Sequence, residues 1–104
     1  MRKAVADSGS KGTVDGMAVN VGNKDARAQF LDMIKSKHGR IDVLVPNAAV
    51  STHFGDQLGI SEKAYDKLWD LNVKSTFFLI KECKEMMTAS GEGGNICVVS
   101  SVTA

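Results

Sequence analysis

The chain has 104 residues, of which 43% are hydrophobic and 24% are charged, and both shares are ordinary for a globular protein. A formal net charge of +1 excludes the basic surface typical of nucleic-acid-binding proteins. The longest apolar runs are far below the roughly 18 residues of a membrane helix, and the N-terminus has no signal-peptide core, so a cytoplasmic or organelle-matrix protein without a nucleic-acid or membrane partner is expected.

The first fifth of the chain predicts a helix end, a turn and a strand. Residues 1–8 have the pattern of a helix end, and residues 9–12 carry the glycines and serine of a stop and turn. Residues 13–21 alternate weakly between apolar and other side chains, which favours a strand despite Gly16.

A helix is expected over residues 24–38. Asn23 can cap its first turn, and the carboxylate of Asp25 suits the positive end of the helix dipole. Gly39 ends this helix. Residues 41–45 follow after a very short turn and are nearly all apolar, as is typical of a parallel strand covered on both faces.

The second half predicts a long helix and a last strand. Ser61 can cap a helix that continues to about Thr88, with apolar side chains recurring at helical spacing. Residues 91–94 are rich in glycine and interrupt it, and residues 95–100 form the strand. Alternating strands and helices predict the α/β class, with a doubly wound parallel sheet and right-handed crossovers in the order βαβαβ.

Ligands of open parallel sheets bind at the carboxyl ends of the strands, so the residues after each strand are candidate site residues. Small side chains in the turn after residue 45 would let a flat ring or a ribose approach the backbone, although a tight turn without a ligand is the simpler alternative. The candidates are Asn20, Val21, Asn47, Ala48, Ala49, Ser100 and Ser101.

Three segments resemble the short-chain dehydrogenase/reductase family in their order and spacing. Strand 41–45 leads into Pro46-Asn47-Ala48-Ala49 where the family has Asn-Asn-Ala-Gly, so Pro46 removes one backbone donor. Leu71-Asn72-Val73 lies within the long helix, and Val98-Val99-Ser100-Ser101 ends the last strand. The resemblance covers essentially all of the chain, and within the family it is to the peroxisomal-type carbonyl reductases.

The resemblance implies a partial Rossmann-like fold. Residues 1–104 would form the central part of one NAD(P)-binding domain, without its N-terminal glycine-rich turn and its C-terminal Tyr-x-x-x-Lys region. The implied reaction is hydride transfer between NADP, or NAD, and a small carbonyl or alcohol substrate. A homo-oligomer located in the cytoplasm or the peroxisomal matrix is expected of the parent enzyme.

Site roles also follow from the resemblance. Ser101 matches the catalytic serine that hydrogen-bonds the substrate oxygen, and Asn72 matches the helix asparagine that holds a water in the proton relay. Asn20 stands where the family often has an aspartate that touches the adenine. No metal ligand is expected. The implied cofactor-binding residues are Asn20, Val21, Asn47, Ala48, Ala49, Val99 and Ser100.

Two parts of the family's machinery have no match in the 104 residues. The tyrosine acid/base needs a lysine four residues on, but the single tyrosine, Tyr65, is followed at that position by Trp69. Residues 12–18 imitate the spelling of the glycine-rich turn without a preceding apolar strand. The chain is therefore expected to be a piece of an oxidoreductase that is inactive on its own. The alternative is a non-catalytic interaction module that associates through the long helix.

Overall fold

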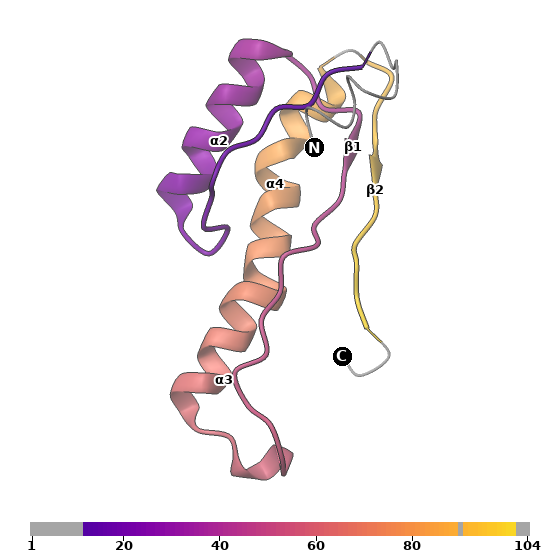
Figure 1. Cartoon of the computed structure of the whole chain (residues 1–104). Helices are drawn as coiled ribbons and strands as arrows, with labels where there is room; N and C mark the ends of the chain where they lie inside the picture. The colour runs from indigo at the N-terminus through magenta and orange to yellow at the C-terminus, as the bar shows by residue number, and fades with distance from the viewer. Residues whose placement is uncertain (1–11, 90, 102–104) are drawn as a thin grey trace.

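The computed structural model describes residues 12–89 and 91–101. In Figure 1, helix α4 lies between α2 on one side and the two strands on the other, and it contacts α2 and β1. The helix end predicted over residues 1–8 lies outside the described residues. The elements are α2 (Lys24–Lys37), β1 (Val43–Leu44), η1 (Gln57–Gly59), α3 (Glu62–Trp69), η2 (Asp70–Lys74), α4 (Ser75–Thr88) and β2 (Asn95–Ile96).

The two strands are parallel neighbours, and helices connect them. Val43 lies opposite Asn95, and Leu44 lies opposite Ile96. Hydrogen bonding continues beyond the short strands, because the Cys97 amide donates to the Leu44 carbonyl at 2.9 Å. A parallel pair joined by a long helical crossover confirms the predicted α/β class.

Residues 13–21 do not form the predicted strand. A strand requires a hydrogen-bonded neighbour, and within the described residues β1 and β2 pair only with each other. The segment instead contacts the C-terminal end of α2, where Asp15 lies 3.6 Å from Lys37 Nζ and 3.5 Å from His38 Nε2. The weak alternation of residues 13–21 therefore did not indicate a strand, because no described strand pairs with them.

Helix α2 begins and ends as predicted. The Asn23 side chain accepts a hydrogen bond from the Ala26 amide at 3.0 Å, which satisfies one of the unpaired donors of the first turn. At the other end, the His38 amide donates to the Ile34 carbonyl, and Gly39 adopts φ 75°, a left-handed conformation that costs glycine little. Local sequence signals are therefore sufficient to define this helix.

The long helical stretch is continuous but not uniform. Ser61 caps α3 by accepting from the Ala64 amide at 3.2 Å, as predicted. Between α3 and α4 lies η2, a π-helical turn over Asp70–Lys74 that the apolar periodicity did not predict. Single π-helical turns within α-helices are rare, and those that exist are often found at functional sites.

The core is small and lies where α2, α4 and β1 meet. Leu31, Cys83 and Met87 are its buried members, and the partly buried residues packed against them are Ile34, Ile41, Leu44 and Met86. On the strands, Val43 remains 57% exposed and Val98 52% exposed. The apolar composition of the strands predicted that both of their faces are covered. The described residues do not provide this cover.

Gly94 lies where the chain before β2 packs closely against Asp42 and against Met87 of α4. A Cβ at this position would lie 2.9 Å from the Asp42 carbonyl oxygen and 2.8 Å from Met87 Cε. That carbonyl accepts the first hydrogen bond between the strands, from the Asn95 amide, so it cannot move freely. We expect Gly94→Ala to lower the free energy of unfolding by about 1–3 kcal/mol, measured by urea denaturation followed by circular dichroism.

Gly16→Ala is the matched control, because a Cβ there has no neighbour within 4 Å and its φ is not left-handed. The control should change the unfolding free energy by less than about 0.5 kcal/mol. Equal effects of the two substitutions would contradict the close approach at Gly94.

Candidate functional site

One side-chain amide joins the long helix to the segment that follows β1. Asn72 Nδ2 donates to the Val50 carbonyl oxygen at 2.8 Å, and Asn72 Oδ1 accepts from the Val50 amide at 2.9 Å. Both ends of the amide therefore bind one residue's backbone, as a neighbouring strand would. This pair fixes the end of the small-residue turn over residues 47–49 relative to η2.

Asn72 lies in the π-helical turn, and Ser75 makes two hydrogen bonds to carbonyls of that turn. The Ser75 amide donates to the Asp70 carbonyl, five residues earlier. The Leu71 carbonyl, four residues before Ser75, accepts from the Ser75 hydroxyl at 2.5 Å. Ser75 is only 2% exposed, so its hydroxyl is closed to bulk water and depends on this bond. Ser75 was not among the predicted site residues; the one signal for it was a hydroxyl residue inside a predicted helix.

Asn20 and Val21 belong to a tight turn before α2. Asn20 Oδ1 accepts from the Gly22 amide at 3.0 Å, and the Asn20 carbonyl accepts from the Asn23 amide at 3.0 Å. Gly22 packs directly against η2, because a Cβ added to it would lie 2.9 Å from Leu71 Cδ2. The turn that carries two predicted cofactor-binding residues therefore touches the residue next to Asn72.

The ends of the two strands lie side by side. The Val99 amide donates to the Pro46 carbonyl at 3.1 Å, so the parallel pairing continues to the residues just before Ser100 and Ser101. Pro46 contributes its carbonyl to this pairing, so the amide that proline lacks is not needed there. The adjoining turn, Asn47, Ala48 and Ala49, is exposed, and so are Ser100 and Ser101.

A chain of contacts thus links the four segments that carry the predicted site residues. Gly22 connects the first turn to η2, the Asn72 amide connects η2 to Val50, and Pro46 connects that segment to Val99. These segments are far apart in sequence; two of them follow the paired strands, whereas Asn20 and Val21 lie at the end of residues 13–21, which form no strand.

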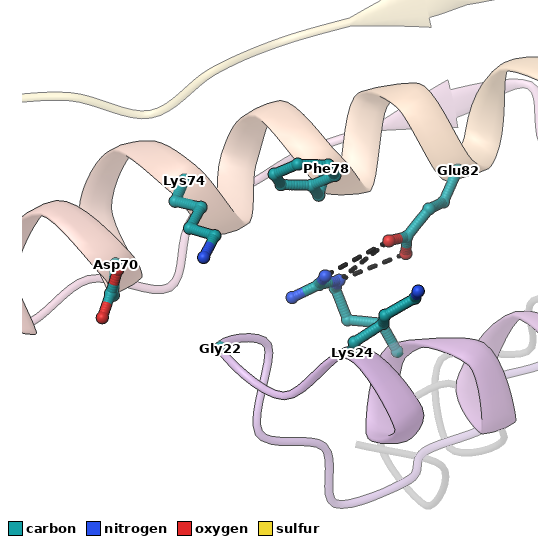
Figure 2. Close-up of a pocket in the computed structure, with 7 residues that line it drawn as sticks. Gly22, Lys24, Asp70, Lys74, Phe78 and Glu82 are labelled. Carbon is teal, nitrogen blue, oxygen red and sulfur yellow. Dashed lines mark hydrogen bonds and ion pairs between the residues drawn. The ribbon is translucent and has the colours of Figure 1, made fainter.

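A pocket of about 340 Å³ adjoins the first turn between α2 and the long helix. Figure 2 shows Lys74, Phe78 and Glu82 on the helix above Gly22 and Lys24. No predicted site residue lines this pocket. Its full lining is Gly22, Lys24, Arg27, Asp70, Lys74, Phe78 and Glu82.

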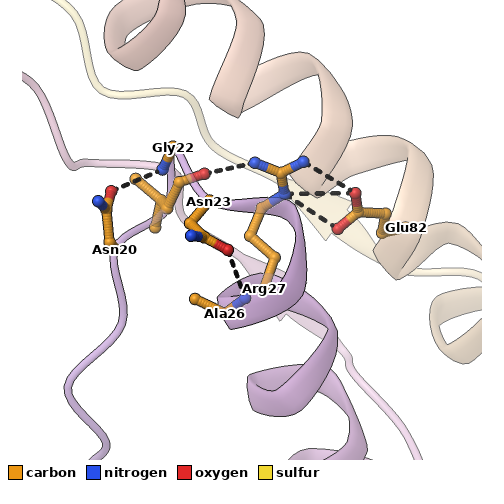
Figure 3. A network of polar contacts seen from close by, with 7 residues as sticks. Asn20, Gly22, Asn23, Ala26, Arg27 and Glu82 are labelled. Atoms are coloured by element: carbon orange, nitrogen blue, oxygen red, sulfur yellow. Dashed lines mark hydrogen bonds and ion pairs between the residues drawn. The ribbon is translucent and has the colours of Figure 1, made fainter.

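Arg27 joins three elements beside the pocket. Its Nε lies 3.1 Å from Glu82 Oε2, and its Nη1 donates to the Val21 carbonyl at 2.6 Å (Figure 3). The guanidinium carbon lies 5.8 Å from the centre of the Phe78 ring. Arg27 is 5% exposed, and these partners compensate for the loss of water around its charged group. Arg27 was not among the predicted site residues, because an arginine on a helix is usually solvated.

The two cysteines have different environments. Cys83 is 1% exposed, and burial, with a smaller effect of Glu82, raises the pKa of its thiol. Cys97 is exposed. Among the described residues, no group of three or more histidine, cysteine, aspartate or glutamate side chains is arranged to hold a metal ion. No described helix has the length and apolarity of a membrane span.

Ser75→Ala tests the π-helical turn. The substitution removes the buried Ser75 hydroxyl that donates to the Leu71 carbonyl, so we expect a loss of about 1–3 kcal/mol in the free energy of unfolding. The control is Thr88→Ala, because the Thr88 hydroxyl makes the same kind of bond to the Lys84 carbonyl but is exposed. Urea denaturation should show a change below about 0.5 kcal/mol for the control. Similar small changes in both variants would contradict this role of Ser75.

Known proteins resemble the chain along its whole length. The family model described as short chain dehydrogenase matches residues 1–104. A bovine protein named dehydrogenase/reductase SDR family member 4 is 38% identical over 103 residues, which are 98% of this chain and 37% of that protein. Tropinone reductase-like 3 of Erythroxylum coca is 32% identical over 88 residues, covering 85% of this chain and 33% of that protein.

A solved structure agrees with these relatives. The crystal structure of a metagenomic short-chain oxidoreductase in complex with NADP has a TM-score of 0.83 and 28% sequence identity, covering 97% of this chain and 44% of that one. The chain thus spans well under half the length of these proteins. The match over all 104 residues and the shared Rossmann-type arrangement confirm the resemblance noted in the sequence: the chain belongs to the short-chain dehydrogenase family.

Proposed function

We propose that the chain is the central part of an NADP-dependent short-chain oxidoreductase that transfers hydride between the cofactor and a small carbonyl or alcohol substrate. The observation that carries this proposal is the chain of contacts from Gly22 through Asn72 to Pro46, because it gathers the predicted site residues at one end of the sheet. The NADP-bound relative and the bovine dehydrogenase/reductase support the cofactor and the reaction class.

The residues at this end of the sheet fit a nicotinamide dinucleotide. Ala48 and Ala49 are small and exposed, so their backbone is open to a flat ring or a ribose. In the turn before α2, the Oδ1 of the exposed Asn20 side chain accepts from the Gly22 amide, and its Nδ2 can donate a hydrogen bond. A donor suits the ring nitrogens of adenine, which accept hydrogen bonds. Val21, Asn47, Val99 and Ser100 complete the proposed cofactor contacts.

Ser101 and Asn72 have different proposed roles in the reaction. Ser101 follows the paired end of the last strand, and its hydroxyl would hydrogen-bond the substrate oxygen, while the bound cofactor supplies or accepts the hydride. Both ends of the Asn72 amide bind Val50, so Asn72 would serve the proton relay by fixing that segment and by offering a remaining lone pair to a water. The carbonyl-reductase activity and a cytoplasmic or peroxisomal-matrix location are part of the same proposal.

Titration with NADPH tests the cofactor site directly. In ¹⁵N-labelled chain, we expect NADPH to shift the amide signals of residues 20–22, 47–49 and 99–101, and to leave those of Lys35 and Lys37 at the far end of α2 unchanged. Ala48→Phe should weaken this binding at least about tenfold, because the ring occupies space at the exposed turn. The control, Ala28→Phe, adds the same ring to an exposed position on α2 and should leave the affinity unchanged.

Shifts spread evenly over the chain, or equal effects of the two alanine substitutions, would contradict the proposed site. The 104-residue polypeptide should show no NADPH-dependent carbonyl reduction, since its sequence holds no Tyr-x-x-x-Lys acid/base. Turnover above background that disappears in Ser101→Ala would overturn this expectation of inactivity.

A non-catalytic interaction module is the second candidate function, and one observation favours it. Apolar and aromatic side chains recur at four-residue intervals along the long helix, each about half exposed or more: Tyr65 (49%), Trp69 (50%), Val73 (48%) and Phe77 (62%). Exposed apolar patches of this kind mark protein–protein contacts. The same surface would serve the homo-oligomer proposed for the parent enzyme, so association alone does not separate the two candidates.

Phe77→Glu tests association through the helix. We expect the substitution to lower the mass of the chain measured by light scattering at a fixed concentration, because a carboxylate opposes burial of the apolar surface. Lys84→Glu, an exposed charged position on the same helix, is the control and should not change the mass. An unchanged mass for Phe77→Glu would exclude this surface. Loss of association with NADPH shifts retained at the sheet end would favour the oxidoreductase over the module.

A further inference from the structure

Arg27 occupies an unusual position for a charged side chain. It lies in the first turns of α2, yet it is 5% exposed, and its guanidinium points toward the long helix. One edge of the guanidinium binds Glu82 of α4, with Nε at 3.1 Å from Oε2 and Nη2 at 3.2 Å from Oε1. This side-on pairing with a carboxylate is a strong and directional arrangement.

The remaining nitrogen of the fork reaches a different element. Arg27 Nη1 donates to the Val21 carbonyl at 2.6 Å, which is a short bond from a charged donor. Val21 lies in the turn between residues 20 and 22, so the bond reaches back from α2 to the segment before it. Through Arg27, the carbonyl of that turn is therefore connected to Glu82 on α4 (Figure 3).

Local hydrogen bonds alone do not place this turn relative to the long helix. The Asn20 side chain binds the Gly22 amide, and the Asn20 carbonyl binds the Asn23 amide, so both bonds hold the turn to itself. The contact of Gly22 with Leu71 is apolar and sets no orientation for the Val21 carbonyl. The Arg27 fork supplies a directional link, since it binds Val21 and Glu82 at once.

We propose that Arg27 is a positioning residue for the adenine half of the cofactor: by joining the Val21 carbonyl to Glu82, it sets where Asn20 and Val21 lie relative to Asn72. This inference rests on the proposed function, in which Asn20 and Val21 contact the cofactor. Lysine cannot replace this role, because its single ammonium group lacks the planar fork that binds two separate acceptors.

Two substitutions separate positioning from simple helix packing. Arg27→Lys keeps a cation that can pair with Glu82, whereas Arg27→Met removes both interactions. We therefore expect Arg27→Lys to unfold thermally close to the unsubstituted chain, while Arg27→Met unfolds at a lower temperature. If Arg27 acts by positioning, Arg27→Lys should nevertheless speed hydrogen exchange at the Gly22 and Asn23 amides about tenfold. Arg40→Lys is the control, because exposed Arg40 binds Asp42 and does not contact the turn.

Adenosine 2′,5′-bisphosphate probes the adenine half of the site. We expect Arg27→Lys to raise its dissociation constant about tenfold, and Arg40→Lys to leave it unchanged. The affinity for nicotinamide mononucleotide should be equal in both variants, since that half of the cofactor would bind at the strand ends. A lysine variant with unchanged amide exchange and unchanged affinity for the bisphosphate would overturn the proposal and leave Arg27 as a helix-packing residue.

Glu82→Gln provides a second test of the proposal if the lysine variant fails to fold. The amide keeps one acceptor for Arg27 but loses the charge that strengthens the link to α4, so exchange at Gly22 should become faster; unchanged exchange at Gly22 would count against the proposal. Failure of the unsubstituted chain to bind adenosine 2′,5′-bisphosphate would contradict the proposed function. In that case, the positioning of the turn by Arg27 would still be decided by amide exchange in Arg27→Lys.

Discussion

The paired hydrogen bonds between the Asn72 amide and the Val50 backbone are the constraint on which the site depends. They join the long helix to the segment that follows β1. The pair requires Asn72 to face the strand end, and the π-helical turn over Asp70–Lys74 provides that orientation. The Ser75 hydroxyl donates to the Leu71 carbonyl of the π-helical turn and so supports the geometry of the proposed site.

Polar contacts contribute much to the relative placement of the elements, because the apolar core of the described residues is small. Three residues form its buried cluster, and the strand valines stay about half exposed. In such a structure, the relative placement of elements rests on directional bonds such as the Arg27 fork, which ties the turn before α2 to α4. The Arg27 ion pair and the amide hydrogen bonds therefore fix the segments that carry the proposed site. The exposed residues of that site are mostly small or polar.

Shared geometry also explains why one family can be identified from so few residues. The small-residue turn after β1, the helix asparagine and the serine pair each look ordinary alone. Their contacts through Val50 and Pro46 give them a common location, and that location requires their order and spacing along the chain. Pro46 and Ala49 depart from the family's Asn-Asn-Ala-Gly in this turn, and the Pro46 carbonyl still accepts the hydrogen bond from Val99.

Sequence alone determined the elements whose signals are local. Asn23 and Gly39 define α2, Ser61 begins the long helix, and the alternation of helices and strands indicates the α/β class, because caps and periodicity depend on neighbouring residues. Tertiary structure decided the rest. Residues 13–21 form no strand because a ladder needs a partner, and the Asn72 pair with Val50 and the Arg27 link to Glu82 depend on groups distant in sequence. No local pattern specifies which partner such a group meets.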